Sequence, residues 1–491
     1  MRTRGGEKEE DTMSTIDELT QRNRTGERAD FIGEDYLLSL VERAQEPTDS
    51  QLEALIAKAL EAKGLELAEV ASLLAIGDQA KLEQLFTAAQ QVKERIYGKR
   101  VVMFAPLYVS NYCVNSCAYC GYHKGNQKLP RVRLTMEEVA HQVRLLEGMG
   151  HKRLALEAGE DPLNCPLEYI LEVIKTIYST SQDHGNIRRV NVNIAATTVE
   201  EYKRLHEAGI GTYILFQETY HRATYNKVHP SGPKSVYDWH TTAMDRAMMG
   251  GCDDVGLGVL FGLFDYRFEV LALLAHSQHL QERFGVGCHT ISVPRIRPAA
   301  GVNLDHVVKY PVDELEFKKI VAILRLAVPY TGLILSTRER SGLRDELLSI
   351  GISQVSAASA TGVGGYREDH DQDQDPTAQF TPDDHRSVDE VLRSICQQGY
   401  LPSYCTACYR RGRTGEHFME LATVGEIQEF CQPNAIITFK EYLLDYASPA
   451  TRKLGEETIA AHLAQIPSPT MRQETIKRLE RLEQGERDLY F

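Results

Sequence analysis

The sequence predicts an α/β protein built on a (β/α)8 barrel, and two observations carry this prediction. Between residues 100 and 359 of the 491-residue chain, short apolar runs alternate with segments of helical periodicity. Eight such units over roughly 250 residues match the usual size of this barrel. An open, doubly wound sheet is the alternative, and in either fold functional groups belong at the carboxyl ends of the strands.

The elements follow one another in a regular order. Residues 1–35 are expected to form a disordered leader, and the three- and four-residue apolar spacing of 36–99 predicts an N-terminal helical extension. The barrel is expected over 100–368, followed by an acidic linker at 369–385 and a small, mainly helical C-terminal region at 386–491. The eight expected strands span 100–109, 153–159, 189–195, 212–218, 254–263, 289–296, 332–339 and 352–359.

Composition narrows the class of protein. The chain is 42% hydrophobic and 25% charged, with a formal charge of −14, which argues against a nucleic-acid partner. No apolar run approaches the roughly 20 residues of a membrane span, and the N-terminus lacks a signal core, which predicts a cytoplasmic protein. Because that compartment is reducing, the ten cysteines are expected to be unpaired, and the grouping of six of them indicates metal.

The first cysteine group directly follows the first expected strand. Cys113, Cys117 and Cys120 have CxxxCxxC spacing. Three thiolates can hold three irons of a 4Fe-4S cubane and leave the fourth iron to a non-protein ligand. A catalytic metal needs such an open position. A zinc site completed by His123 and three incidental thiols are the alternatives.

The second group is Cys405, Cys408 and Cys431, a CxxC pair followed after 22 residues by a third cysteine. Spacing alone favours neither of two interpretations. One is a zinc knuckle with His417 as fourth ligand, and the other is a second iron–sulfur cluster.

The cysteine motif after the first strand, with "EAGED" (157–161) after the second, resembles the radical S-adenosylmethionine (SAM) enzymes. The resemblance implies a TIM-type radical SAM barrel in which SAM chelates the open iron and the reduced cluster splits SAM into methionine and a 5′-deoxyadenosyl radical. The "EAGED" element differs from the family's Gly-Glu pattern, since Ala158 replaces one glycine. For Arg246, an ordinary arginine on the surface of a helix is a commoner interpretation than a residue that binds SAM. The resemblance implies five cofactor-binding residues, namely Tyr119, Gly159, Glu160, Glu218 and Arg246.

Both cysteine groups together resemble the HydG family of tyrosine lyases, which mature FeFe-hydrogenases. That resemblance implies cleavage of L-tyrosine to p-cresol and dehydroglycine. Carbon monoxide and cyanide then form and are captured by an extra iron on a second 4Fe-4S cluster. It also implies a ferredoxin or flavodoxin as electron donor and other hydrogenase maturases as partners. A thiamine-pathway tyrosine lyase with a structural C-terminal metal site and a non-catalytic zinc scaffold are the alternatives.

Four further residues follow from the HydG resemblance. Ser336 and Arg338, in "LSTRE" at the end of the seventh strand, are expected to bind the carboxylate of tyrosine. Arg295, at the end of the sixth strand, is expected to bind substrate or SAM. His289, at the start of that strand, is a candidate ligand of the extra iron, although a structural histidine is the commoner meaning.

Overall fold

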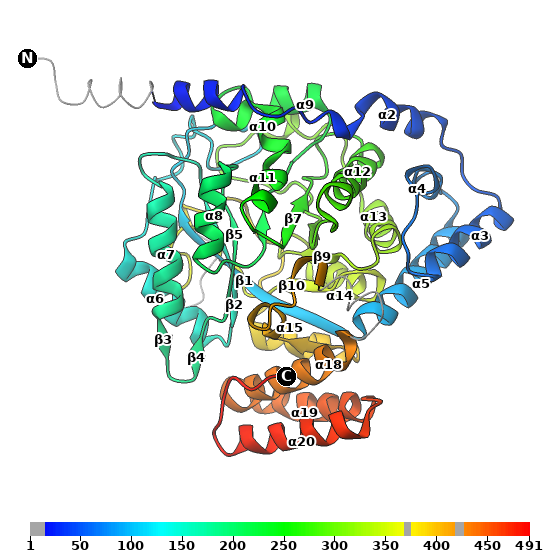
Figure 1. Cartoon of the computed structure of the whole chain (residues 1–491), viewed down its shortest axis with the longest axis vertical. Coiled ribbons are helices and arrows are strands. Elements are labelled where there is room, and N and C mark those ends of the chain that lie inside the picture. Colours follow the sequence, from blue (N-terminus) through cyan, green and yellow to red (C-terminus); the bar gives the residue numbers. More distant parts are fainter. Residues whose placement is uncertain (1–14, 368–374, 418–426) are drawn as a thin grey trace, which may run out of the picture.

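The computed structural model describes residues 15–367, 375–417 and 427–491. Eight parallel strands form a closed barrel, because the last strand pairs with the first through Val102–Gln354, Met103–Val355 and Phe104–Ser356. The predicted (β/α)8 barrel is therefore confirmed (Figure 1). Its strands are β1 (Arg100–Ser110), β2 (Arg153–Ala158), β5 (Arg189–Asn193), β6 (Tyr213–Ile214), β7 (Val255–Gly258), β8 (Thr290–Ser292), β9 (Gly332–Leu335) and β10 (Gln354–Ser356).

Helices cover the outside of the barrel. Several begin at a side-chain cap, as at Thr135, whose hydroxyl accepts from the Glu138 amide in the capping box visible in the sequence. The helices are α6 (Met136–Gly148), α7 (Leu167–Ser179), α8 (Val199–Glu207), α9 (Arg222–Val228), α10 (Tyr237–Thr241), α11 (Ala243–Met249), α12 (Tyr266–Phe284), α13 (Glu314–Ala327) and α14 (Ser341–Ile350). Two short helices, α10 and α11, meet at Thr242. Smaller elements are η2 (Pro233–Ser235), η3 (Leu304–His306) and a hairpin of β3 (Ser181–Gln182) and β4 (Gly185–Asn186).

The inside of the barrel is polar. In most such barrels branched apolar side chains fill the interior in layers. Here inward positions of three strands carry amides and hydroxyls that line a cavity instead: Asn191 and Asn193 on β5, Ser292 on β8, and Gln354 and Ser356 on β10. The apolar core lies between strands and helices, which leaves the centre of the barrel hollow.

The N-terminal extension packs along one side of the barrel, with α5 against α13 (Figure 1). It consists of η1 (Asp30–Ile32), α2 (Glu34–Arg43), α3 (Asp49–Leu60), α4 (Leu67–Leu74) and α5 (Gln79–Tyr97). Residues 1–14 of the expected leader lie outside the described residues. The rest of that leader departs from the expectation of disorder, since 15–23 form a helix. Three of its apolar residues, Ile16, Ala29 and Ile32, are buried, and the Ala29 amide donates to Asp238 at 3.1 Å.

The C-terminal region attaches to the opposite end of the barrel from the strand carboxyl ends. A ninth strand, β11 (Leu401–Ser403), pairs in parallel with the first residues of β1, from Arg100 to Val102. Around it lie α15 (Val388–Gln397), α16 (Ala407–Arg410), α18 (Ile427–Asp445), α19 (Pro449–Ala464) and α20 (Pro469–Glu483), below the barrel in Figure 1. No helix in the described part of the chain is long and apolar enough to cross a membrane.

The segment expected as a linker, 369–385, lies partly outside the described residues, which resume at 375. From there it belongs to the barrel wall. Asp384 forms a buried ion pair with Arg344, and the amide of Asp383 donates to the Thr337 carbonyl at 2.8 Å. Its acidic residues have partners on α14 and after β9, which composition alone does not reveal.

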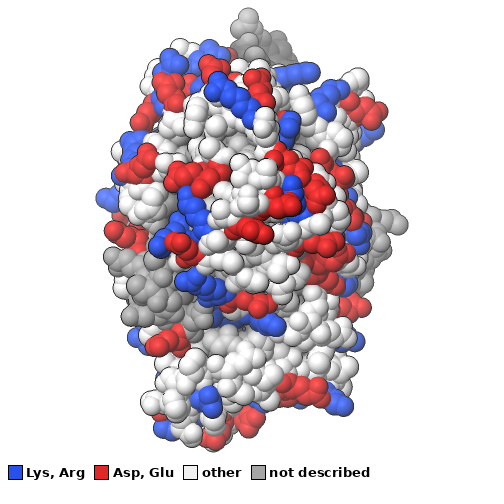
Figure 2. Space-filling view, turned by 90° about the vertical axis from the view of Figure 1, so that its right-hand side faces the viewer, with Lys and Arg blue, Asp and Glu red and all other residues white. Residues whose placement is uncertain are grey.

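Charged side chains of both signs are interspersed on the face in Figure 2. One ion-pair group is buried and joins barrel to C-terminal region. The Glu441 carboxylate on α18 lies 2.5 Å from the Arg188 guanidinium and 3.8 Å from Lys152 Nζ. The Nε atom of Arg188 is also 3.0 Å from Asp488. The Arg188 and Glu441 side chains are 3% and 1% exposed. Removing one partner of such a pair leaves the other charge buried without compensation.

Arg188→Met is therefore expected to lower the free energy of unfolding by about 3–5 kcal/mol. Arg204→Met is the matched control, since Arg204 pairs with Glu168 at 2.9 Å on the surface, and a loss below about 1 kcal/mol is expected. Urea unfolding of both variants measures the difference. Equal losses would show that Arg188 does not anchor the C-terminal region.

Candidate functional site

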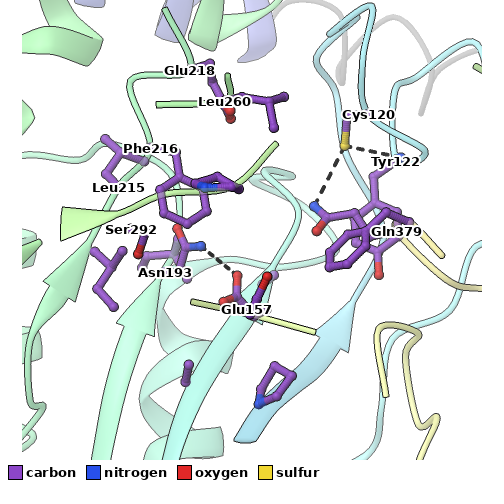
Figure 3. A pocket seen from close by; sticks show the side chains of 18 of the residues that line it. Cys120, Tyr122, Glu157, Asn193, Leu215, Phe216, Glu218, Leu260, Ser292 and Gln379 are labelled. Atoms are coloured by element: carbon purple, nitrogen blue, oxygen red, sulfur yellow. Dashed lines mark hydrogen bonds between the residues drawn. The ribbon is translucent and has the colours of Figure 1, made fainter. Parts of the chain in front are cut away.

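A cavity opens at the carboxyl ends of the barrel strands, and we call it the upper cavity. The loops after four strands supply its predicted residues, so side chains far apart in the sequence meet there (Figure 3). Those that line it are Cys113, Cys117, Tyr119, Cys120, Gly159, Glu160, Glu218, Ser336 and Arg338. These nine predicted residues therefore lie together at one cavity, and their functional roles stay predictions.

The loop after β1 carries the three cysteines, and one arginine organises it. The Arg131 guanidinium donates to three carbonyls of this loop, those of Asn111, Tyr122 and His123, at 2.6, 2.8 and 2.6 Å. Amide groups point at two of the sulfurs. Asn115 Nδ2 lies 3.7 Å from the Cys113 sulfur, and Gln379 Nε2 lies 3.8 Å from that of Cys120.

The electrostatics of the three thiols fit a bound iron cluster. Burial raises the pKa of all three, and that of Cys120 reaches about 11, with Cys113 adding to the effect. A coordinated metal stabilises the thiolate and removes this cost. Among the described residues, no three His, Cys, Asp or Glu side chains are placed to share a single metal ion, which both zinc hypotheses require.

The loop after β2 lies against the cysteine loop. The Val114 amide donates to the Glu160 carbonyl at 2.8 Å, and Asn115 Nδ2 donates to Glu160 Oε2 at 2.6 Å. A Cβ atom at Gly159 would lie 2.3 Å from the Tyr112 carbonyl oxygen and 3.2 Å from Cys113 Cβ. Only glycine allows this approach, which brings the Glu160 carboxylate beside the cluster-binding loop.

A lysine and a glutamate form a buried pair across the cavity. Lys234 Nζ lies 2.8 Å from Glu218 Oε1, and Glu218 has a left-handed backbone with φ of 69°. Although burial opposes its charge, Glu218 and Cys117 raise the pKa of Lys234. Tyr119 also lines the cavity, and its hydroxyl is 2.8 Å from His229 Nε2. Lys234 thus places a permanent positive charge beside the thiols.

Arg338 is a cation without an anion. Its guanidinium stacks on the Phe380 ring at 3.4 Å, and it forms no hydrogen bond or ion pair with any residue in the described ranges. Burial lowers its pKa, although Tyr108, Glu218, Cys120 and Glu157 act in the opposite direction. The Arg338 amide donates to Ser336 Oγ at 3.4 Å, which fixes this hydroxyl beside it. A carboxylate ligand would complete the site.

A second cavity, the lower cavity, lies at the amino ends of the strands. All three C-terminal cysteines line it, together with His289 at the start of β8 and several cationic or aromatic side chains, including Arg100, Arg153, Tyr409 and Arg413. The cysteines of the C-terminal region therefore face the barrel interior. His417, the fourth ligand of the zinc hypothesis, is exposed and does not line this cavity.

The lower thiols also form an electrostatically coupled group. Burial raises the pKa of Cys405 to about 11. The interaction between the Cys408 and Cys431 thiols raises the pKa of Cys408 and lowers that of Cys431. His289 lies near this group, with Nε2 3.4 Å from the Tyr409 hydroxyl and Nδ1 3.5 Å from Asp254 Oδ1, and burial lowers its pKa. A neutral imidazole is the form that binds metals.

One residue, Gln354 on β10, lines both cavities. The hydroxyl groups of two barrel-strand residues, Thr290 on β8 and Ser356 on β10, are buried and have no hydrogen-bond partner in the described part of the protein. Buried polar atoms of this kind are rare unless a water or ligand satisfies them. Gln354 is therefore a polar residue of the wall between the two cavities.

Comparisons with known proteins agree with this geometry. Residues 107–274 match the Radical SAM superfamily, and residues 292–401 match the Biotin and Thiamin Synthesis associated domain. The 2-iminoacetate synthase of Escherichia coli (strain K12) is 32% identical over 351 residues, which are 71% of this chain and 89% of the relative.

Two solved structures extend the match into the C-terminal region. The crystal structure of HydG, a maturase of the FeFe-hydrogenase, is 58% identical with a TM-score of 0.91 and covers 94% of this chain and all of that one. This chain belongs to the HydG family. HydG from Carboxydothermus hydrogenoformans is 39% identical with a TM-score of 0.80, over 93% of this chain and all of that one.

Two predicted arginines lie outside the upper cavity of this HydG-family chain. Arg295 pairs with Glu339, with Nε 3.0 Å from Oε1, and donates to the Val312 carbonyl at 2.9 Å. The Arg246 guanidinium stacks on the Trp239 ring. It donates hydrogen bonds to the carbonyls of Thr197 and Trp239 and to the Thr242 hydroxyl. Neither guanidinium has donors directed at the cavity, so both are structural here.

Sequence reasoning missed several residues of the site. Lys234 lies in "SGPKS", which carries no recognisable motif, and Gln379 and Phe380 belong to the segment expected as a linker. Glu157 and Asn193 alternate inward on their strands, a pattern that could have identified them as lining residues once the barrel was assumed.

Gly159→Ala is expected to impair loading of the first cluster, because the new Cβ atom collides with the backbone that leads into Cys113. Anaerobic reconstitution followed by iron and sulfide analysis should give roughly half the wild-type content, that of the second cluster alone. Gly148→Ala is the control, since a Cβ atom there meets nothing within 4 Å. Full loading of the Gly159 variant would contradict the assigned contact.

Proposed function

We propose that this protein is a radical SAM tyrosine lyase of hydrogenase maturation. It cleaves the Cα–Cβ bond of L-tyrosine to p-cresol and dehydroglycine, then converts dehydroglycine to carbon monoxide and cyanide on an iron that becomes part of the hydrogenase cofactor. The observation that carries the proposal is the pair of three-cysteine groups, one at each end of a single hollow barrel. Membership of the HydG family supports it.

The upper cavity provides for the cofactors. Cys113, Cys117 and Cys120 would hold a 4Fe-4S cluster, and Gly159 with Glu160 would bind the amine of SAM. Bound together, cluster and SAM would supply the radical chemistry that removes a hydrogen atom from the substrate amine. Glu218, oriented by Lys234, would accept a hydrogen bond from the ribose. The enclosed wall excludes water from this region.

Arg338 orients the substrate. Its unpaired guanidinium matches the geometry of a carboxylate, and Ser336 adds a hydroxyl beside it. Because Phe380 holds the guanidinium plane on one side, the bound carboxylate is fixed in direction. Orientation of this kind supplies a large part of a catalytic effect. Arg338 is therefore the residue that presents the amine of tyrosine toward the radical source.

The lower cavity provides for the second stage. Dehydroglycine carries a carboxylate, and its route would run past Gln354, which lines both cavities, to the lower cavity with Arg153 and Arg413. Cys405, Cys408 and Cys431 would hold the second 4Fe-4S cluster, and neutral His289 would bind the iron that is carried away as product. An internal route keeps a reactive fragment from solvent.

The proposal includes the wider setting of the reaction. A ferredoxin or flavodoxin would reduce the clusters, other hydrogenase maturases would receive the iron product, and the protein would act in the cytoplasm. The HydG resemblance supports these partners, and the ten free cysteines are consistent with a reducing compartment.

Arg338→Met should raise the KM for tyrosine by about 10–100-fold, the effect of losing a charge-assisted hydrogen-bond pair. Steady-state formation of p-cresol measures it. Arg133→Met is the matched control, since Arg133 also stacks on an aromatic ring, that of Tyr169 at 4.9 Å, but is exposed and does not line the cavity. An unchanged KM in the Arg338 variant would remove this residue from the substrate site.

The two cysteine groups should be separable. Cys113→Ala is expected to abolish p-cresol, whereas Cys408→Ala should retain p-cresol and lose carbon monoxide. Anaerobic turnover with SAM, dithionite and tyrosine, with product analysis, measures both. Loss of p-cresol in a folded Cys408 variant would contradict the assignment of tyrosine cleavage to the first cysteine group and of carbon monoxide formation to the second. Wild-type turnover that yields p-cresol without cyanide would favour a 2-iminoacetate synthase that stops at dehydroglycine, the activity named for the Escherichia coli relative.

A further inference from the structure

A carboxyl–amide pair lies in the upper cavity away from the cysteines. Glu157 on β2 and Asn193 on β5 are cross-strand neighbours, and Asn193 Nδ2 donates to Glu157 Oε2 at 2.7 Å. Both side chains point into the cavity, and Figure 3 shows them well separated from Cys120 and Glu218. The cofactor roles proposed above use neither residue.

Two other carboxylates of this cavity, Glu160 and Glu218, are proposed to bind SAM, and Glu157 differs from both of them. Glu160 accepts from Asn115, and Glu218 is paired with Lys234. Glu157 Oε1 has no hydrogen-bond partner among the described residues, and no cation pairs with this side chain. Burial raises the pKa of Glu157 to about 8, although Asn193 and Arg338 act in the opposite direction. A largely neutral carboxyl of this kind is suited to an uncharged hydroxyl partner.

The walls around this pair are apolar. Apolar side chains from β1 and from the segments after β5 and β6 line the same cavity, and Figure 3 shows Leu215 and Phe216 on the side of Asn193. The set includes Phe104, Pro106, Tyr108, Ile194, Leu215 and Phe216. Ligand sites commonly combine apolar walls with a few polar groups that fix orientation. The chemistry of this part of the cavity suits an aromatic ring that ends in a hydroxyl group.

We propose that Glu157, held by Asn193, binds the phenol hydroxyl of the substrate and thereby selects tyrosine over phenylalanine. The inference rests on the proposed function, since it assumes that Arg338 binds the substrate carboxylate. With Arg338 at one end and Glu157 at the other, both ends of tyrosine are fixed. A site built to bond a hydroxyl discriminates strongly against the analogue that lacks it, because its own polar groups would stay unpaired.

The experiment measures binding of L-tyrosine and L-phenylalanine to the reconstituted, SAM-loaded protein by anaerobic equilibrium dialysis. Wild type should prefer tyrosine. Glu157→Ala is expected to weaken tyrosine binding by about tenfold or more and to leave phenylalanine binding nearly unchanged. Asn193→Ala, which leaves the carboxyl in place but unsupported, should shift the same preference by a smaller factor. Glu168→Gln, a surface carboxylate paired with Arg204, is the control and should leave both affinities unchanged.

The outcomes separate the two proposals. Equal weakening of both amino acids in the Glu157 variant would place this carboxyl at the substrate backbone and overturn the inference. Unchanged preference in both folded, cluster-loaded variants would overturn it as well. Failure of the wild-type protein to bind or cleave tyrosine would instead overturn the proposed function. The KM for p-cresol formation should rise in step with the tyrosine dissociation constant, whereas a merely structural defect would lower cluster content.

Discussion

Strand β1 determines the arrangement of the whole protein. It pairs with β2 and β10 to close the barrel, and its first residues also pair with β11. Its carboxyl end runs into the loop that carries Cys113, whereas β11 leads directly to Cys405. Eleven residues at about 3.3 Å each span about 35 Å, so a single strand holds the two cysteine groups at opposite ends of one interior.

That interior is hollow and polar, and stability has to come from elsewhere. The apolar core lies between strands and helices, and buried pairs such as Arg188–Glu441 and Arg344–Asp384 join outlying segments to the barrel. Inside, unpartnered hydroxyls and an unpaired guanidinium remain, all of which are costly without a ligand. The barrel thus concentrates unsatisfied polar groups where substrate and intermediates are proposed to lie.

Sequence patterns predicted the parts of the structure that repeat or that have fixed spacing. The alternation of strands and helices located all eight barrel strands, and the cysteine spacing located both groups. The sequence did not show which side chains pair with one another. Arg295 and Arg338 both follow barrel strands, yet Glu339, the neighbour of Arg338 in the chain, pairs with Arg295 and leaves Arg338 available. Residues 375–385 look like a linker because their partners, Arg344 and Thr337, are distant in sequence.

The central claim is that two iron–sulfur clusters occupy opposite ends of one barrel. A pulsed electron paramagnetic resonance measurement of the distance between the clusters in the reduced protein tests it most directly. The account predicts two distinct cluster signals separated by a distance on the order of 30 Å, set by the length of β1. A single signal, or two clusters within about 15 Å of each other, would contradict a strand of this length between them.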